Sequence, residues 1–128
     1  MIVAIQAGDR DKDPAQTRRH MHGLIDEFTS DGDTLLYISQ PSTMMDQVLP
    51  VAEDLGLDVT KITCDFMAHG REAWVYALTE LVVSADHFLM LSGYDTLSPV
   101  NRDFLSYVDF AGKRYNSRTI EYERIVVT

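Results

Sequence analysis

The chain has 128 residues, with 20 Asp and Glu against 11 Lys and Arg, so its formal net charge is −9. Apolar residues make up 45% and charged residues 24%, which is typical of one globular domain, here 1–128, that buries a core. The negative charge argues against binding to nucleic acid or to an anionic membrane surface, because both need basic side chains. No apolar run has the length of a membrane span, and the single Cys64 excludes an internal disulfide, so we expect a cytoplasmic protein.

The chain begins with a strand pattern and continues with a helix pattern. Ile2–Ala7 is a short apolar run that ends at Gly8, as in a buried strand. Pro14 suits the first turn of a helix, with Asp13 as its N-cap, and apolar residues then recur at helical spacing. Thr34–Ile38 is the second predicted strand.

A second helix and a third strand follow. Ser42 or Thr43 is placed to cap this helix, whose apolar face continues until Gly56 ends it. Pro50 lies inside the pattern, which predicts a kink or a late start of the helix. Val59–Thr63 is a shorter strand pattern.

The second half of the chain repeats this alternation. Arg71–Ala85 has a strong helix pattern, and His87–Leu91 is an apolar strand pattern. Ser98 and Pro99 open a further helix that extends to about residue 111. The alternation of apolar and polar residues over Arg118–Val127 predicts a last strand.

These patterns predict a single α/β domain. Strands that alternate with helices through short connections favour a Rossmann-like, doubly wound, mostly parallel sheet of about five strands with helices on both faces. In such a sheet, ligands bind beyond the carboxyl ends of the strands. Four loops are expected at that edge: Gly8–Asp13, Gln40–Thr43, Asp65–Arg71 and Ser92–Ser98.

The first of these loops, Gly8–Asp13, has alternating aspartates. It is not an EF-hand calcium loop, which needs Gly at its sixth position and Glu at its twelfth, because Pro14 and His20 occupy those positions. Arg10 is placed to bind an anionic ligand. Asp11 would then orient the ligand or accept a hydrogen bond from a sugar hydroxyl. The alternative is a solvated polar loop that ends in a helix cap.

The second loop has no glycine, and the chain contains neither a dinucleotide-binding G-x-G-x-x-G nor a P-loop. We therefore expect no resident cofactor. Backbone amides at the start of the following helix, with the hydroxyls of Ser42 and Thr43, are suited to an anion. Ordinary capping explains the two hydroxyls equally well.

His69 is the titratable residue best placed for function, because it lies on the predicted binding edge beside Asp65 and Arg71. His20 and His22 lie two residues apart on a predicted helix and point to different faces, so they do not chelate one metal. We expect no metal site. His87 at a strand start is interpreted as structural, and Cys64 as a small buried residue.

The helix pattern Arg71–Ala85 is apolar around much of its circumference. It is either buried within the domain or uses its surplus apolar face in a subunit contact, because so small a domain has little interior. We expect a homo-oligomer formed through helix 71–85.

The order of features resembles the small YspA-like members of the SLOG superfamily, the Rossmann-like group that includes the DprA and Lonely Guy proteins. The G-x-R-D turn that follows the first strand in such proteins is matched by Gly8-Asp9-Arg10-Asp11. Their aspartate-preceded fourth strand is matched by Ala85–Leu91, and their closing turn by Gly93–Thr96. The family's glycine-rich turn is replaced here by Gln40–Met45, with Asp46 in the expected place.

The resemblance implies a domain that binds a small nucleotide- or nucleoside-derived ligand at the carboxyl edge of the sheet. The expected ligand-binding residues are Gly8, Arg10, Asp11, Ser42, Thr43, Asp46, His69, Arg71, Ser92, Gly93, Tyr94 and Thr96. One alternative is an enzyme that cleaves or transfers the N-glycosidic bond of a nucleotide, with Asp46 and His69 as its catalytic pair. Another is a degenerate domain that serves protein–protein interaction.

Overall fold

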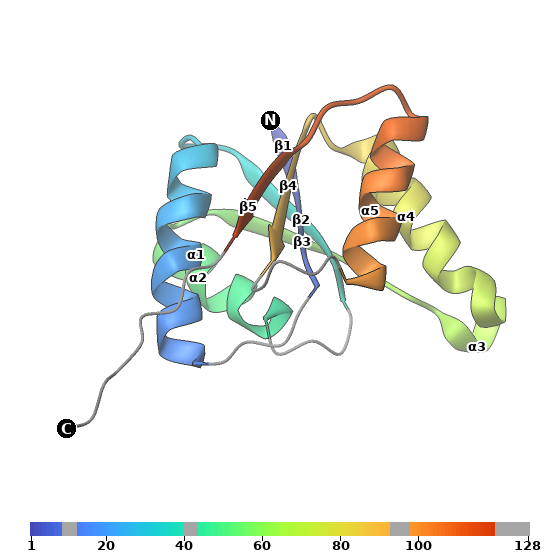
Figure 1. The fold of residues 1–128 in the computed structure, drawn as a ribbon, viewed down its shortest axis with the longest axis horizontal. Coiled ribbons are helices and arrows are strands. Elements are labelled where there is room, and N and C mark those ends of the chain that lie inside the picture. Colours follow the sequence, from blue (N-terminus) through green and yellow to red (C-terminus); the bar gives the residue numbers. More distant parts are fainter. Residues whose placement is uncertain (9–12, 40–43, 93–97, 120–128) are drawn as a thin grey trace.

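Strands and helices alternate along the chain in the computed structural model, which describes residues 1–8, 13–39, 44–92 and 98–119 (Figure 1). The strands are β1 (Ile2–Ala7), β2 (Thr34–Ser39), β3 (Asp58–Thr63), β4 (His87–Ser92) and β5 (Asn116–Thr119). The α-helices are α1 (Pro14–Phe28), α2 (Val48–Asp54), α3 (Phe66–His69), α4 (Ala73–Ser84) and α5 (Pro99–Phe110). Two 3-10 turns, η1 (Met45–Gln47) and η2 (Gly70–Glu72), precede α2 and α4.

The strands form one all-parallel, five-stranded sheet in the order β3-β2-β1-β4-β5. The chain moves outward from β1 to β3, crosses back over β1 to β4, and continues to β5. Because such crossovers are right-handed, the helices of the two halves fall on opposite faces of the sheet. Figure 1 shows α1 and α2 on one side and α4 and α5 on the other. The predicted Rossmann-like, doubly wound architecture is confirmed.

The central strand β1 is buried on both faces and separates two apolar layers. Val3 and Ile5 pack in the layer that includes Met21 of α1, while Ala4 packs in the layer that includes Leu78 of α4. This explains why β1 is an almost continuous apolar run, as is usual for central parallel strands.

Two predicted helix starts are confirmed. Oδ1 of Asp13 accepts hydrogen bonds from the backbone N–H groups of Ala15 and Gln16, at 3.0 and 3.2 Å. At the start of α5, Ser98 Oγ accepts from the backbone N–H of Asn101 at 3.3 Å. Both helices carry proline in their first turn, where the missing N–H has no intrahelical partner to lose.

Proline also sets where α2 begins. The segment starts as the 3-10 turn η1, and the α-helix begins only at Val48, so Pro50 lies in its first turn. A late helix start, one of the two predicted possibilities, is therefore the one observed. The expected end is confirmed, because Gly56 follows the helix with a φ of +69°.

The structure corrects the region between β3 and β4. The sequence predicts a loop over Asp65–Arg71, but residues 66–69 form the short helix α3. Asp65 caps its first turn by accepting a hydrogen bond from Ala68 N–H at 3.0 Å. The predicted helix over Arg71–Ala85 begins at Ala73, after η2. Gly70, with a φ of +57°, separates α3 from the helix that follows.

The last strand begins earlier than predicted. The expected strand over Arg118–Val127 lies mostly outside the described residues, whereas β5 starts at Asn116 and pairs with β4 from Leu89 onward. The start of β5 is polar because this strand lies at the edge of the sheet, where backbone pairing rather than burial decides its position.

At the amino end of the sheet, Asp33 accepts hydrogen bonds from the N-terminal amine at 3.1 Å and from Ser30 N–H at 2.8 Å. The hydrogen bond from Ser30, followed by the one from the amine, lowers the pKa of Asp33. The stabilisation from the ionised carboxylate is therefore present above the ordinary aspartate pKa and is lost as the pH falls through the lowered value. We expect the stability difference between wild type and Asp33→Asn in urea denaturation to shrink on acidification. A difference that stays constant with pH would contradict this.

Candidate functional site

The carboxyl ends of β1 and β4 meet where the strand order reverses. Ala7 is paired with Leu91, yet the chain leaves β1 toward α1 on one face and β4 toward α5 on the other (Figure 1). Ligands of open parallel sheets usually bind at this switch point of the strand order, and the name crevice stands for this position in the topology alone. Two of the predicted ligand-binding residues, Gly8 and the buried Ser92, lie here.

Gly8 lies so close to the start of α5 that a side chain at this position would displace neighbouring side chains. A Cβ there would lie 2.0 Å from Ser98 Oγ and 2.5 Å from Asn101 Oδ1. Neither neighbour is free to move, because Ser98 caps α5 and Asn101 Nδ2 donates to the carbonyl of Leu91 at 3.1 Å. Glycine therefore allows β1, β4 and α5 to meet in this crevice.

Two buried carboxamide side chains belong to this region: Asn101 lies against Gly8, and Gln6 of β1 lies two residues before Gly8. Gln6 and Asn101 are both 0% exposed. Gln6 Nε2 donates to the carbonyl of Ala7 at 3.1 Å, as Asn101 Nδ2 does to Leu91. Neither Gln6 Oε1 nor Asn101 Oδ1 has a hydrogen-bond partner among the described residues. Each buried acceptor without a partner lowers the free energy of unfolding by about 1–3 kcal/mol. Two of them are therefore a considerable destabilisation for a small domain, and they call for an explanation.

A second feature of the carboxyl edge is a cavity of about 170 Å³ beside β2 and β3. It is lined by Tyr37, Ser39, Met45, Asp46, Leu49 and Lys61. Tyr37 and Lys61 are directly paired across the two strands, and Ser39 lies two residues farther along β2, so the three side chains share one face of the sheet.

The turn that carries Asp46 is held from two sides. The next residue, Gln47, accepts hydrogen bonds from both Nε and Nη2 of Arg18 on α1, at 3.1 and 2.9 Å. Met45, on the other side of Asp46, accepts the N–H of Ala7 through its sulfur at 3.1 Å. The second contact ties η1 to the end of β1, so the cavity has a fixed position relative to the crevice.

The structure does not bring Asp46 and His69 together. Asp46 belongs to η1, which packs with α1 and α2, whereas His69 ends α3, which packs on α4 (Figure 1). The His69 ring stacks at a tilt on Tyr76 of α4, with 4.7 Å between the ring centroids. His69 and Arg71 are both exposed. His69 and Arg71 therefore lie apart from the crevice beside Gly8.

Seven of the predicted ligand-binding residues lie outside the described residues: Arg10, Asp11, Ser42, Thr43, Gly93, Tyr94 and Thr96. The described part of the predicted site is therefore Gly8, Asp46, His69, Arg71 and Ser92. Of these, Gly8 and Ser92 lie at the crevice and Asp46 at the neighbouring cavity.

The thiol of Cys64 is partly buried, and this burial raises its pKa. A raised pKa keeps the thiol protonated, so Cys64 is a poor nucleophile. Within the ranges that the structure describes, no cluster of three or more His, Cys, Asp or Glu side chains is arranged to hold a metal ion. The described helices also include none that is both long and apolar enough to cross a membrane.

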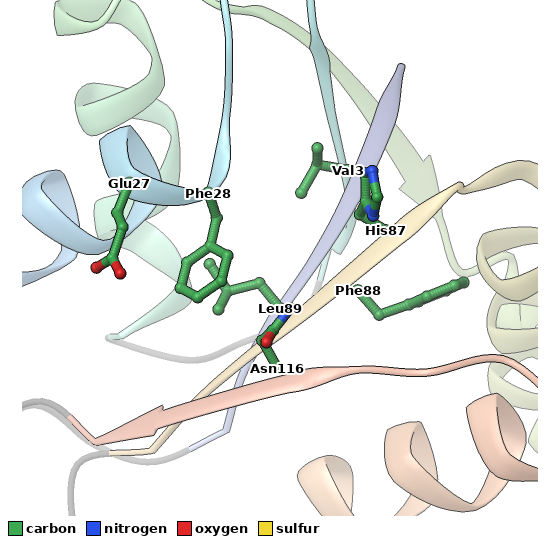
Figure 2. A pocket seen from close by; sticks show the side chains of 7 residues that line it. All are labelled: Val3, Glu27, Phe28, His87, Phe88, Leu89 and Asn116. Carbon is green, nitrogen blue, oxygen red and sulfur yellow. The ribbon is translucent and has the colours of Figure 1, made fainter.

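A separate pocket of about 240 Å³ lies between the end of α1 and the first half of β4 (Figure 2). Its apolar wall includes Val3, Phe28 and Leu89, and Figure 2 shows Phe88 pointing to the other side of β4. His87, which we interpreted as structural, contributes to its lining. This pocket lies along the amino-terminal half of the strands, away from the carboxyl edge.

Sequence patterns missed three residues that the structure places at this edge. Gln6 is the polar residue within the apolar run of β1, and Asn101 precedes the buried Phe104 and Val108 on the inner face of α5. Both are polar residues at positions whose periodicity predicts burial, which is the signal that marks them. Lys61 gives no such signal, because only the pairing of β2 with β3 places it opposite Tyr37.

Comparison with known proteins adds no relative: no family model matches the chain, and neither the curated proteins nor the solved structures give a significant match.

Proposed function

We propose that this protein binds a small nucleotide- or nucleoside-derived ligand at the carboxyl edge of its sheet, in the crevice between β1 and β4. The observation that carries this proposal is the pair of buried oxygens, Gln6 Oε1 and Asn101 Oδ1, which have no partner among the described residues. Their amide nitrogens are already committed to backbone carbonyls, so both oxygens are left as acceptors. A ligand with N–H or O–H groups would donate the hydrogen bonds that these two oxygens lack.

Bases and riboses carry such donors, and the strand order supports the same class of ligand, because nucleotides bind where the order of an open α/β sheet reverses. The resemblance of Gly8-Asp9-Arg10-Asp11 to the SLOG turn is a further support. The net charge of −9 repels anions, so we favour a compact ligand with few charges.

A glycosidase or transferase would need a carboxylate and a general acid of the protein to contact the same ligand. Because Asp46 and His69 lie on different elements, we favour binding over catalysis. Release of free base from nucleoside monophosphates by the wild type, abolished in Asp46→Asn, would reverse this preference.

We test the binding proposal with Gln6→Met. The substitution removes the buried unpartnered oxygen and also the hydrogen bond from Nε2 to the Ala7 carbonyl, and it keeps the length of the side chain. Because these two effects oppose each other, we expect the free energy of unfolding in urea to change by less than about 1 kcal/mol. Calorimetric affinity for the nucleosides or nucleotides that the wild type binds should fall at least tenfold. Gln16→Met is the control, because the Gln16 side chain donates to Asp13 at 3.1 Å and its loss should lower stability.

A panel of nucleosides and nucleoside phosphates that gives no binding to the wild type, by calorimetry and by thermal shift, would refute the proposed function. Gln6→Met with unchanged affinity would refute the role of the buried oxygens.

We also propose that two copies of the chain associate through α4. Five of the nine large apolar side chains that are exposed among the described residues lie on α3 and α4: Phe66, Met67, Val75, Tyr76 and Val83. An exposed apolar face of this kind is typical of an interaction surface. Val75 and Val83 lie four residues on either side of Thr79, so an antiparallel two-fold contact would pair each valine with the partner's other one.

A further inference from the structure

The cavity beside β2 and β3 combines hydrogen-bond donors with a cation. Lys61 offers an ammonium group, and Tyr37 and Ser39 offer hydroxyls, all on the same face of two adjacent strands. Met45 and Leu49 form the apolar wall opposite. Such a set of donors matches the oxygens of a phosphate group, which are all acceptors.

Lys61 lines this cavity without being used by the protein itself. It has no hydrogen bond or ion pair among the described residues, and it does not approach Asp46 within 4.0 Å, although both line the same cavity. Two other basic side chains are engaged within the protein: Arg18 donates to Gln47, and Lys113 donates to the carbonyls of Val82 and Ala85, whereas Arg71, Arg102 and Arg114 resemble Lys61 in having no such partner among the described residues. In a chain with a net charge of −9, an unpaired ammonium beside two hydroxyls favours an anion locally, although Asp46 lines the same cavity.

The size of the cavity limits what it holds. A volume of about 170 Å³ is below the roughly 300 Å³ or more of pockets that enclose a whole drug-sized ligand. The cavity therefore takes one group of a larger ligand. Lys61 supplies one positive charge and Asp46 adds a negative one at the same cavity, which suits a single phosphate better than a chain of phosphates.

The cavity is also within reach of the crevice. β2 lies next to β1, and β1 next to β4, so two strand spacings of about 4.8 Å each separate β2 from β4. Tyr37, Ser39 and Lys61 lie on the face of the sheet that α1 and α2 cover, whereas Gln6 and Asn101 lie on the face that α4 and α5 cover, so a nucleoside monophosphate that uses both sets must pass over the carboxyl end of β1. Its base would lie at Gln6 and Asn101, and its ribose would pass Asp46, whose carboxylate accepts hydrogen bonds from sugar hydroxyls.

We propose that Lys61, Tyr37 and Ser39 form the phosphate subsite of this protein and that its ligand is a nucleoside monophosphate. This inference rests on the proposed function for its ligand class. Side chains from two strands here do the work that glycine-turn amides do in other phosphate sites, which is consistent with the lack of glycine in residues 40–43.

The direct test uses inorganic phosphate, followed by backbone amide shifts in two-dimensional NMR of the full chain. We expect saturable shifts at Tyr37, Ser39 and Lys61 in the wild type, and their loss in Lys61→Gln. The control is Arg114→Gln, which makes the same change in net charge, from −9 to −10, at an exposed residue beyond the amino end of β5 and should keep the shifts. Absence of saturable shifts in the wild type, or their survival in Lys61→Gln, overturns the subsite.

A second titration compares nucleosides with their 5′-monophosphates. We expect the monophosphate to bind at least tenfold tighter than its nucleoside in the wild type and in Arg114→Gln, and equally in Lys61→Gln. If inorganic phosphate binds but no nucleoside or monophosphate does, the proposed function fails and the anion site stands. If nucleosides bind and the phosphate adds nothing, the subsite fails and the proposed function stands.

Discussion

Replacing Gly8 with alanine is expected to lower the free energy of unfolding by about 3 kcal/mol, the upper end of the usual cost of overpacking. The new Cβ would lie 2.0 Å from Ser98 Oγ and 2.5 Å from Asn101 Oδ1, so α5 must move away from β1 or both side chains must turn. Either movement breaks the cap of α5 or the hydrogen bond from Asn101 to Leu91. Urea denaturation measures the change, and ligand binding should be lost with it because the crevice is distorted.

The matched control is Gly23→Ala. Gly23 lies exposed within α1, and a Cβ there meets nothing within 4 Å. Alanine at this position should therefore stabilise the protein by about 0.5–1 kcal/mol through its better helix propensity. In a Ser98→Gly background, the cost of Gly8→Ala should also fall, because the nearest clashing atom is gone. Equal effects of the two glycine substitutions would contradict the close approach at Gly8.

The fold was predictable because the local signals agree with one another. β1 has the apolar run of a central parallel strand, and Asp13 and Ser98 each precede a proline that suits a first helical turn. Alternation of strands and helices then leaves few arrangements, since crossovers are right-handed. The boundaries that differ have local causes: Pro50 delays α2, and Gly70 divides α3 from the helix that follows.

The candidate site was only partly predictable, because it depends on which elements become neighbours. The pairing of β2 with β3 places Lys61 opposite Tyr37, and the docking of α5 against β1 brings Asn101 to Gly8. Neither neighbour relation follows from the spacing of residues along the chain. In a chain of net charge −9, an anion needs a local cation. The sequence favours Arg10 for this role, and Arg10 lies outside the described residues, whereas the proposed phosphate subsite uses Lys61.

Val83→Asp is expected to abolish association of the chain, measured by size-exclusion chromatography with light scattering. Val83 is 74% exposed on the outer face of α4, so the aspartate is solvated in the monomer and leaves its stability nearly unchanged. In a two-fold contact, the same change places two carboxylates in the apolar interface, where they are desolvated without partners. Phe110→Asp is the control, because Phe110 is 95% exposed but belongs to α5 and not to the proposed α4 contact.

Cross-linking tests the proposed symmetry independently of affinity. In the background Cys64→Ser, which removes the one native cysteine, Thr79→Cys should give a disulfide-linked dimer on oxidation, because the proposed two-fold axis would place residue 79 opposite its own copy. Val75→Cys alone should give no disulfide-linked dimer. The double variant Val75→Cys and Val83→Cys should give one, because the proposed axis pairs position 75 with position 83 of the other copy. The proposed antiparallel arrangement also opposes the two helix dipoles. A wild type that stays monomeric at every concentration, or a dimer that survives Val83→Asp, would refute the α4 interface.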